Sequence, residues 1–293
     1  MTYVKLDPTC SRLGNWLFSY AAALTAHPAD QISFVVRTGN WLDDPRKYSE
    51  LWPTARYELC PATNCTQCGK CRIGTFINAT ALNQPLVQQA LHCPDSTRQR
   101  ILDQFGELLA TPTASISVRR GDYLKLPHTH PFVGEKYLAD AVNRLDDITN
   151  FIVCSDDIPW CEKFFTQHRF PGKKFYFSPN CDVLIGLFLP TFCIHNIISN
   201  STFSWWGAFL NPHKDKRIIS PSMWLGIAVK NRAAYSRNLH IKNMEIIQNQ
   251  YSFPRLLLAS TLWGAYGTVN ILRNFKKKLP RHPHSQITPS PCA

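Results

Sequence analysis

Residues 113–123 read TASISVRRGDY, and this stretch decides the fold class. A short, apolar, β-prone segment ends at two consecutive arginines, Arg119 and Arg120, which Gly121 and Asp122 follow. A strand that points into a core has no place for two guanidinium groups unless something anionic meets them. The stretch therefore predicts a buried strand that delivers two cations to an anion-binding edge.

Downstream of that strand, apolar strand-like segments alternate with helix-like ones. The predicted strands are NFIVCS (150–155), KKFYFS (173–178), IHNIIS (194–199) and RIIS (217–220). Such a rhythm predicts a parallel sheet that is covered on both faces, in which ligands bind at the carboxyl ends of the strands. That rule places the following residues around one crevice: Arg119, Arg120, Asp122, Asp156, Asp157, Asn200, Ser201, Thr202, Phe203 and Ser204.

The chain of 293 residues is long enough for two domains. Its first 40 residues read as a strand, a glycine turn, a helix and a second strand, which is a βαβ opening. We expect an N-terminal α/β half over 1–113 with a Cys-rich insertion, a Rossmann-like half over 114–225, and a basic C-terminal tail over 226–293.

The turn SNSTFSWW (199–206) places Ser and Thr at the start of a predicted helix. Amide N–H groups and hydroxyls at a helix N-terminus bind phosphate, and arginine binds phosphate oxygens through two parallel hydrogen bonds. Together with the arginines this predicts a diphosphate site. No Walker lysine or GxGxxG fingerprint follows a strand. A diphosphate held in this way needs no divalent metal, so we expect neither a metal nor a cofactor.

The aspartates near the predicted site leave several roles open. Asp156 and Asp157 fit a metal ligand pair, hydrogen bonds to a sugar or base, or the cap of the helix that begins at Ile158. Asp182 opens another helix, which it caps unless it accepts a hydrogen bond from a nucleobase. Asp122 either orients the arginines or acts as a base toward an acceptor hydroxyl. We favour the orienting role, because a carboxylate beside two arginines is a weak base.

The formal net charge of +12 is concentrated near the C-terminus. Residues 226–293 hold ten Lys or Arg and one acidic residue, so the body of the chain is nearly balanced and nucleic acid is not an expected partner. The apolar run 256–272 is flanked by basic residues. It predicts either a helix packed on the body or a membrane-surface contact through residues 255–281. The start of the sequence has no signal-peptide pattern, so we expect a cytoplasmic or membrane-associated protein.

Four of the eleven cysteines cluster at Cys60, Cys65, Cys68 and Cys71. Their short spacing is compatible with a metal site, a local disulfide knot or free thiols in a surface insertion. The sequence does not choose among these three.

Four segments carry a resemblance to a known family: SRLGNWLFSYAAAL, SVRRGDY, FIVCSDDIPWCEKFF and ISNSTFSWWGAFLN. In this order, over about residues 5–224, they look like the successive motifs of glycosyltransferase family 11. This is the α-1,2-fucosyltransferase family, related to the wider fucosyltransferase superfamily. The resemblance implies a GT-B-like fold of two Rossmann-like halves, with the donor site at the C-terminal half. It also implies GDP-fucose as donor, a galactoside acceptor, inversion at the anomeric carbon and no metal.

The resemblance also implies roles for individual residues. Arg119 and Arg120 would hold the β-phosphate of GDP, and Gly14, Asn15 and Trp16 would lie on the acceptor side of the cleft. Ser117 stands where the family usually has His, and Trp16 stands where it usually has Gln. These departures leave two alternatives open, namely a catalytically impaired nucleotide-sugar-binding protein and a related transferase that uses another nucleotide sugar.

Overall fold

The computed structural model describes residues 2–6, 12–37, 43–54, 56–60, 79, 82–166, 170–178, 182–249 and 261. Of the predicted cluster Cys60, Cys65, Cys68 and Cys71, all but Cys60 lie outside this set, as does the segment 255–281 apart from Thr261. Within the described residues, no helix combines the length and the apolar character that are needed to span a membrane.

The chain folds into two units, and each is built on one parallel sheet. The first unit contains a sheet of three strands in the order β1-β2-β3. These strands are β1 (Thr2–Leu6), β2 (Ile32–Arg37) and β3 (Arg56–Cys60), and α1 (Leu13–Ala26) connects the first two. Helix α1 is buried on nearly every side, as expected of a helix with apolar residues all round that lies inside a core. The predicted βαβ opening is thus confirmed.

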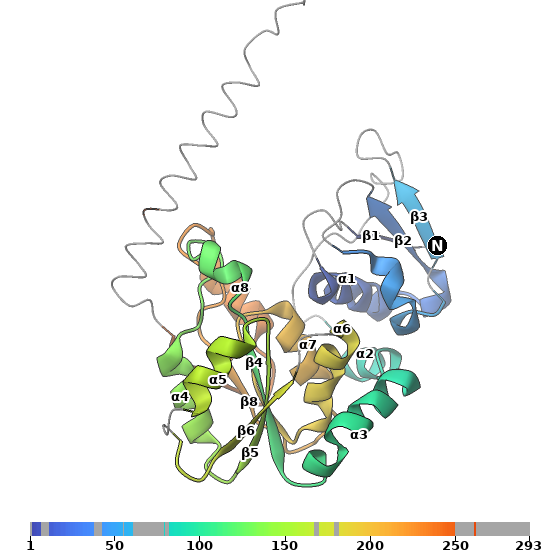
Figure 1. Ribbon diagram of the computed structural model, residues 1–293. Coiled ribbons are helices and arrows are strands. Elements are labelled where there is room, and N and C mark those ends of the chain that lie inside the picture. Colours follow the sequence, from blue (N-terminus) through green and yellow to red (C-terminus); the bar gives the residue numbers. More distant parts are fainter. Residues whose placement is uncertain are drawn as a thin grey trace, which may run out of the picture.

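The second unit is a six-stranded parallel sheet in the order β6-β5-β4-β7-β8-β9. Its strands are β4 (Thr113–Val118), β5 (Asn150–Ser155), β6 (Lys174–Ser178), β7 (His195–Ile197), β8 (Ile218–Pro221) and β9 (Met244–Ile247). The main helices that precede, connect and cover them are α2 (Gln84–Ala90), α3 (Asp95–Leu109), α4 (Glu135–Arg144), α5 (Ile158–Thr166), α6 (Val183–Phe188), α7 (Thr202–Leu210) and α8 (Arg232–Leu239). The predicted α/β class with two parallel sheets is confirmed (Figure 1).

One boundary needs correction. The prediction ended the second half at residue 225, but β9 pairs in parallel with β8, and Met244 lies opposite Ile218. Residues up to Ile247 therefore belong to the sheet rather than to a tail. The strand is only four residues long, and the helix before it is largely polar. Neither segment has the strong periodicity that would identify it in the sequence.

The two faces of the large sheet are covered differently. Helices α4 and α5 pack on one face, while α6 and α7 pack on the other and face α1 of the first unit (Figure 1). One hydrophobic cluster runs from β1 and α1 through α7 to the large sheet. The two units therefore share a core, and α7 lies between them.

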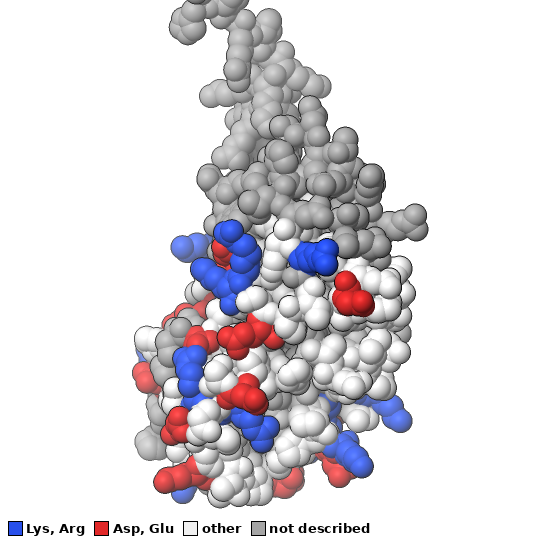
Figure 2. Space-filling model, turned by 90° about the vertical axis from the view of Figure 1, so that its right-hand side faces the viewer, with Lys and Arg blue, Asp and Glu red and all other residues white. Residues whose placement is uncertain are grey.

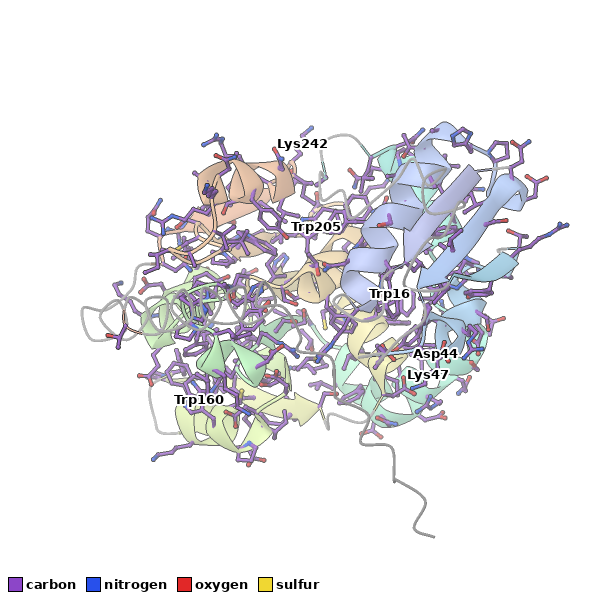
Figure 3. The ribbon with its side chains drawn as sticks, turned by 90° about the horizontal axis from the view of Figure 1, so that it is seen from above. Trp16, Asp44, Lys47, Trp160, Trp205 and Lys242 are labelled. Atoms are coloured by element: carbon purple, nitrogen blue, oxygen red, sulfur yellow. The ribbon has the colours of Figure 1, made fainter. Side chains whose placement is uncertain are left out.

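Helix α7 is fixed along its whole length. The indole N–H of Trp206 donates to Gly14 O at 2.9 Å, and the indole N–H of Trp205 donates to Leu239 O at 2.8 Å. Figure 3 shows Trp205 where α7 meets the first unit. At the other end, the buried ammonium of Lys216 donates to carbonyl oxygens of the last turn of α7, among them Ala208 O at 3.0 Å. The N-terminus of α7 is thereby held in a fixed place.

Candidate active site

The large sheet has a topological switch point at β4. From β4 the chain builds β5 and β6 on one side, then crosses to build β7, β8 and β9 on the other. In such sheets the connections diverge at this point and leave a crevice at the carboxyl ends of the two central strands, where ligands bind. Here the strands are β4 and β7, which Arg119 and Ser199 closely follow.

Arg119 lies at this crevice between two carboxylates. Its Nη2 is 2.7 Å from Asp122 Oδ1, and its Nη1 is 2.9 Å from Asp156 Oδ2. The guanidinium also lies 5.5 Å from the centre of the Tyr123 ring. The side chain is 27% exposed, so a strongly oriented cation faces solvent at the predicted ligand edge.

Arg120 lies in a different environment from its neighbour. Its guanidinium lies 4.0 Å from the ring centre of Trp160 and 4.8 Å from that of Phe132, and its Nε donates to Asp157 Oδ2 at 2.9 Å. The side chain is 12% exposed. The two guanidinium groups thus contact different residues, although Arg119 and Arg120 are adjacent in the chain. This arrangement differs from the expectation that both arginines hold one phosphate, and Arg119 is the more exposed of the two.

The paired aspartates act as supports. Asp156 Oδ1 accepts a hydrogen bond from the backbone N–H of Arg120 at 2.8 Å while its other oxygen pairs with Arg119. A Cβ on Gly121 would lie 2.6 Å from Asp156 Oδ2, so glycine is required for this close approach. Asp157 Oδ1 accepts from Trp160 N at 3.3 Å, which is the predicted capping role. Within the described ranges, no group of three or more His, Cys, Asp or Glu is arranged to hold a metal.

The Ser/Thr cluster at the start of α7 is only partly open. Thr202 Oγ1 donates to Asn15 Oδ1 at 2.9 Å, and the Ser204 hydroxyl donates to Ser201 O at 2.9 Å. Phe203 packs against the core. Ser201 is the N-cap of α7, and its side chain makes no capping hydrogen bond to the helix. Ser201 is half-exposed, and the first N–H groups of a helix have no acceptor within the helix.

Asn200 supports the site from inside. It is 3% exposed, and its amide donates to Pro131 O at 2.8 Å and to Trp224 O at 2.9 Å. Its Oδ1 is buried and has no hydrogen-bond partner among the described residues. The backbone carbonyl of Asn200 accepts from the hydroxyl of Tyr123 at 3.2 Å. Asn200 thus joins the ends of β7 and β8 to the loop that follows β4.

Two residues that the sequence analysis missed line the same loop. The ring of Tyr123 stacks on that of His130, with centroids 5.0 Å apart and an angle of 21° between the planes. Burial raises the pKa of Tyr123 to about 12, so its hydroxyl stays a donor. Burial lowers the pKa of His130, while nearby Asp122 acts in the opposite direction. Both residues lie in an irregular loop, where no periodicity marks a side chain as functional.

Gly14 and Asn15 meet the site directly. A Cβ on Gly14 would lie 2.7 Å from both Phe203 N and Thr202 Oγ1, so the backbone of α1 closely abuts the start of α7. Trp16 does not fit its predicted role. It is 2% exposed, and its ring packs 6.4 Å from that of Tyr48 inside the first unit (Figure 3). The predicted place of Trp16 on the acceptor side of the cleft is therefore corrected to a core position.

Asp182 caps a helix. Its Oδ1 accepts from Leu184 N at 2.7 Å and Ile185 N at 3.3 Å, and its Oδ2 pairs with Arg100 of α3. Burial acts to raise the pKa of Asp182, but the hydrogen bonds from Arg100 and the backbone outweigh it and lower the pKa. The capping alternative is the one that this geometry shows.

The comparisons with known proteins point to one family. A family model described as "Glycosyl transferase family 11" matches residues 83–239, a little over half of the chain. The chain is 39% identical over 119 residues to an O-antigen biosynthesis glycosyltransferase, WbnK, of Escherichia coli. This match covers 38% of the chain and 39% of that protein.

Two further relatives are more distant. An alpha-1,2-colitosyltransferase of Escherichia coli is 32% identical over 120 residues, which cover 39% of the chain and 41% of that protein. The galactoside 2-alpha-L-fucosyltransferase Sec1 of Mus musculus is 33% identical over 105 residues, or 32% of the chain and 27% of that protein. The matched stretch thus spans less than half the length of each of these three relatives.

Two solved structures resemble the fold of this chain weakly. POFUT1 in complex with GDP has a TM-score of 0.46 at 10% identity, over 74% of this chain and 98% of that one. Escherichia coli ADP-heptose LPS heptosyltransferase II has a TM-score of 0.49 at 11% identity, over 90% and 98%.

Proposed function

Because the chain belongs to glycosyl transferase family 11, we propose that it transfers fucose from GDP-fucose to a galactoside hydroxyl and forms an α-1,2 linkage. One observation carries this proposal: the family match encloses the whole switch-point crevice, from β4 to α8. The names of two relatives support the α-1,2 linkage, and the name of one supports a galactoside acceptor and fucose.

We assign the diphosphate of the donor to Arg119 and to the N-terminus of α7. Negative charge grows on the diphosphate as its bond to the sugar breaks, and fixed donors that meet this charge lower the barrier. A guanidinium and a helix N-terminus are both suited to phosphate oxygens. Arg120 does not touch the donor in this proposal, and its place between two aromatic rings holds the strand end in position.

The proposed reaction is a single displacement with inversion. The acceptor oxygen forms a bond to the anomeric carbon, the bond from that carbon to the phosphate oxygen breaks, and GDP leaves with the electron pair. The proton of the acceptor hydroxyl passes to a base. Since the cationic groups of the protein offset the charge of the leaving diphosphate, we propose that no divalent metal is required.

The test is a turnover assay with a panel of nucleotide sugars and β-galactosides, scored for nucleoside diphosphate release and for the glycoside product. The proposal predicts GDP release from GDP-fucose that depends on the acceptor and is unchanged by EDTA. Loss of activity in EDTA would contradict the metal-free mechanism. Release of a different nucleoside diphosphate would contradict the choice of donor.

A nucleotide-activated colitose should be among the donors tested, because one relative is an alpha-1,2-colitosyltransferase. If this donor is used better than GDP-fucose, the chain shares the donor preference that the name of that relative indicates. Binding of nucleotide without any turnover would identify the third possibility, a catalytically impaired binding protein.

A further inference from the structure

Both terminal amino groups of Arg119 are engaged by carboxylates. Nη1 pairs with Asp156 at 2.9 Å and Nη2 pairs with Asp122 at 2.7 Å. The guanidinium carries one positive charge, and two carboxylates already meet it. A diphosphate that approaches Arg119 is therefore repelled unless one of these carboxylates moves away. Donor binding at Arg119 therefore displaces a carboxylate, and the surroundings of the two aspartates decide which one.

Asp156 is the fixed partner. Its second oxygen accepts the backbone N–H of Arg120 at 2.8 Å, and its carboxylate lies against the backbone of Gly121. Its side chain is 17% exposed. Moving Asp156 would break a hydrogen bond to the main chain and leave a partly buried N–H without its acceptor, which is costly.

Asp122 is the displaceable partner. Its side chain is 46% exposed, and it lies at the start of the short helix Asp122–Lys125, three residues after Arg119. An ion pair at such exposure is weak, because water and salt screen it. A diphosphate brings more negative charge and more acceptor oxygens to the guanidinium of Arg119 than the single carboxylate of Asp122 does. It therefore replaces Asp122 before it replaces Asp156.

We propose that the diphosphate of the donor displaces Asp122 from Arg119, and that the released carboxylate then accepts the proton of the acceptor hydroxyl. This proposal rests on the proposed function and adds a catalytic residue to it. In the structure, Oδ1 of Asp122 is occupied by a hydrogen bond from Arg119 Nη2 at 2.7 Å, and loss of this partner frees the oxygen to accept the O–H of an acceptor. Base and donor are thereby coupled, since Asp122 becomes competent only when a diphosphate occupies Arg119.

The atoms balance in one cycle. The acceptor O–H loses its proton to Asp122, its oxygen bonds to the anomeric carbon, and the bond from that carbon to the phosphate oxygen breaks toward the diphosphate. Arg119 holds the departing nucleoside diphosphate. After it leaves, Asp122 gives its proton to water and forms the ion pair with Arg119 that the structure shows.

The experiment compares the full-length chain with Asp122→Asn, which keeps the size of the side chain and removes its charge. GDP affinity is measured by calorimetry without acceptor, and kcat is measured with saturating donor and acceptor. The proposal predicts that GDP binds about two- to fivefold more tightly, because its competitor for Arg119 is gone. It also predicts that kcat falls by at least about a hundredfold, the smaller end of the range for losing a general base.

The matched control is Glu245→Gln. Glu245 pairs with Arg217 at 2.6 Å near the amino-terminal edge of the sheet. It therefore provides the same kind of carboxylate–guanidinium pair at the opposite end of the strands from the crevice. Neither GDP affinity nor kcat should change in this variant. Asp122→Ser serves as a second variant if the amide disturbs folding, which thermal unfolding will show.

The outcomes separate the two proposals. If the wild type binds GDP but Asp122→Asn and Asp122→Ser bind it more weakly, Asp122 orients Arg119 for phosphate and the exchange is wrong. If both variants keep the wild-type kcat, Asp122 is not the base. If the wild type binds no GDP, the proposed donor itself is wrong, and the exchange is overturned with it.

Discussion

Arg120 is the residue whose place in the structure differs most from the expectation for a phosphate ligand. Its guanidinium packs between two aromatic rings and pairs with Asp157, while Arg119, one residue earlier, faces the crevice. Cation–π contacts of a partly desolvated arginine stabilise a fold by about 1–2 kcal/mol. We infer that Arg120 acts through stability and Arg119 through ligand binding.

Arg120→Leu should therefore lower the free energy of unfolding by about 2 kcal/mol, because it removes the cation–π contacts and leaves Asp157 without its partner. Urea unfolding followed by fluorescence measures this loss. Arg119→Leu is the comparison, and it should cost less stability because its side chain is more exposed. Equal losses in the two variants would show that the contrast between the residues is wrong.

The sequence was informative about residue types at strand ends and less informative about their directions. It identified Arg119, Asp156 and Ser201 because continuous apolar segments end just before them. It grouped Arg120 with Arg119, because the aromatic partners of Arg120, Phe132 and Trp160, lie 12 and 40 positions away in the chain and nothing in the sequence pairs them with it. It also misplaced Trp16, because a resemblance fixes a position in the chain but not the depth of that position in a core.

Among the helices, α7 contributes most to the candidate site. Its start faces the switch point, its two tryptophans bind the backbones of Gly14 and Leu239, and a hydroxyl of its first turn contacts Asn15. The helix is apolar all round because it lies between the large sheet and α1. This composition was visible in the sequence. The contact with α1 was not, because it joins residues that are almost two hundred positions apart.

Gly14→Ala should lower the free energy of unfolding by about 1–2 kcal/mol. The new Cβ would lie 2.7 Å from the backbone nitrogen of Phe203, which cannot move without shifting α7. Overpacking of this kind costs about 1–3 kcal/mol, which exceeds the gain of somewhat less than 1 kcal/mol in helix propensity. The same variant should weaken GDP binding, because the start of α7 moves.

Gly106→Ala is the control for that prediction. Gly106 lies in α3, and a Cβ there meets no atom within 4 Å. The substitution should raise the free energy of unfolding by about 0.5–1 kcal/mol through helix propensity alone. If Gly14→Ala is also stabilising, α1 and α7 are not in the tight contact that the structure describes.

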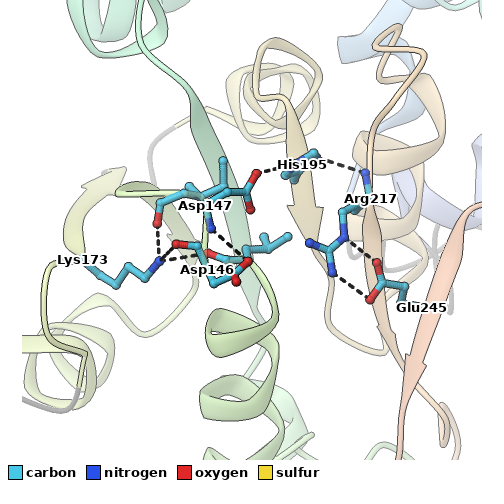
Figure 4. A network of polar contacts seen from close by, with 8 residues as sticks. Asp146, Asp147, Lys173, His195, Arg217 and Glu245 are labelled. Carbon is cyan, nitrogen blue, oxygen red and sulfur yellow. Dashed lines mark hydrogen bonds and ion pairs between the residues drawn. The ribbon is translucent and has the colours of Figure 1, made fainter.

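For the molecule as a whole, the two edges of the large sheet are chemically different. The carboxyl edge holds the crevice, while the amino edge holds a network that links Asp147, His195, Arg217 and Glu245 (Figure 4). Basic and acidic side chains are interspersed on the face shown in Figure 2. This agrees with a body that is nearly balanced in charge. We therefore attribute ligand specificity to the crevice and not to the electrostatic field of the whole molecule.

The amino-edge network makes stability depend on pH. His195 Nδ1 accepts the backbone N–H of Arg217 at 3.1 Å, so this nitrogen is unprotonated, and burial lowers the pKa of His195 from its ordinary value of 6.5. Below pH 6.5 the unfolded chain binds a proton that the folded chain does not. Stability is therefore full above pH 6.5 and is lost as the pH falls from there through the folded pKa.

We expect the free energy of unfolding to be lower at pH 5 than at pH 7, and we expect His195→Asn to reduce that difference. The Asn carbonyl keeps an acceptor for Arg217 N without a titrating group. Urea unfolding at both pH values measures the effect. An undiminished difference in the variant would mean that other groups set the pH dependence, among them His130 and His240, whose pKa values are also lowered by burial.

If the crevice beside Arg119 is the donor site, the protein should bind GDP without added metal through Arg119. Calorimetric titration should compare the wild type with Arg119→Ala and with Arg217→Ala, an arginine in a similar carboxylate pair at the opposite edge. The account predicts that the wild type and Arg217→Ala bind GDP equally. Arg119→Ala should bind at least about tenfold more weakly, as expected for loss of one charge-assisted contact. Equal GDP affinity in Arg119→Ala and the wild type would contradict the account.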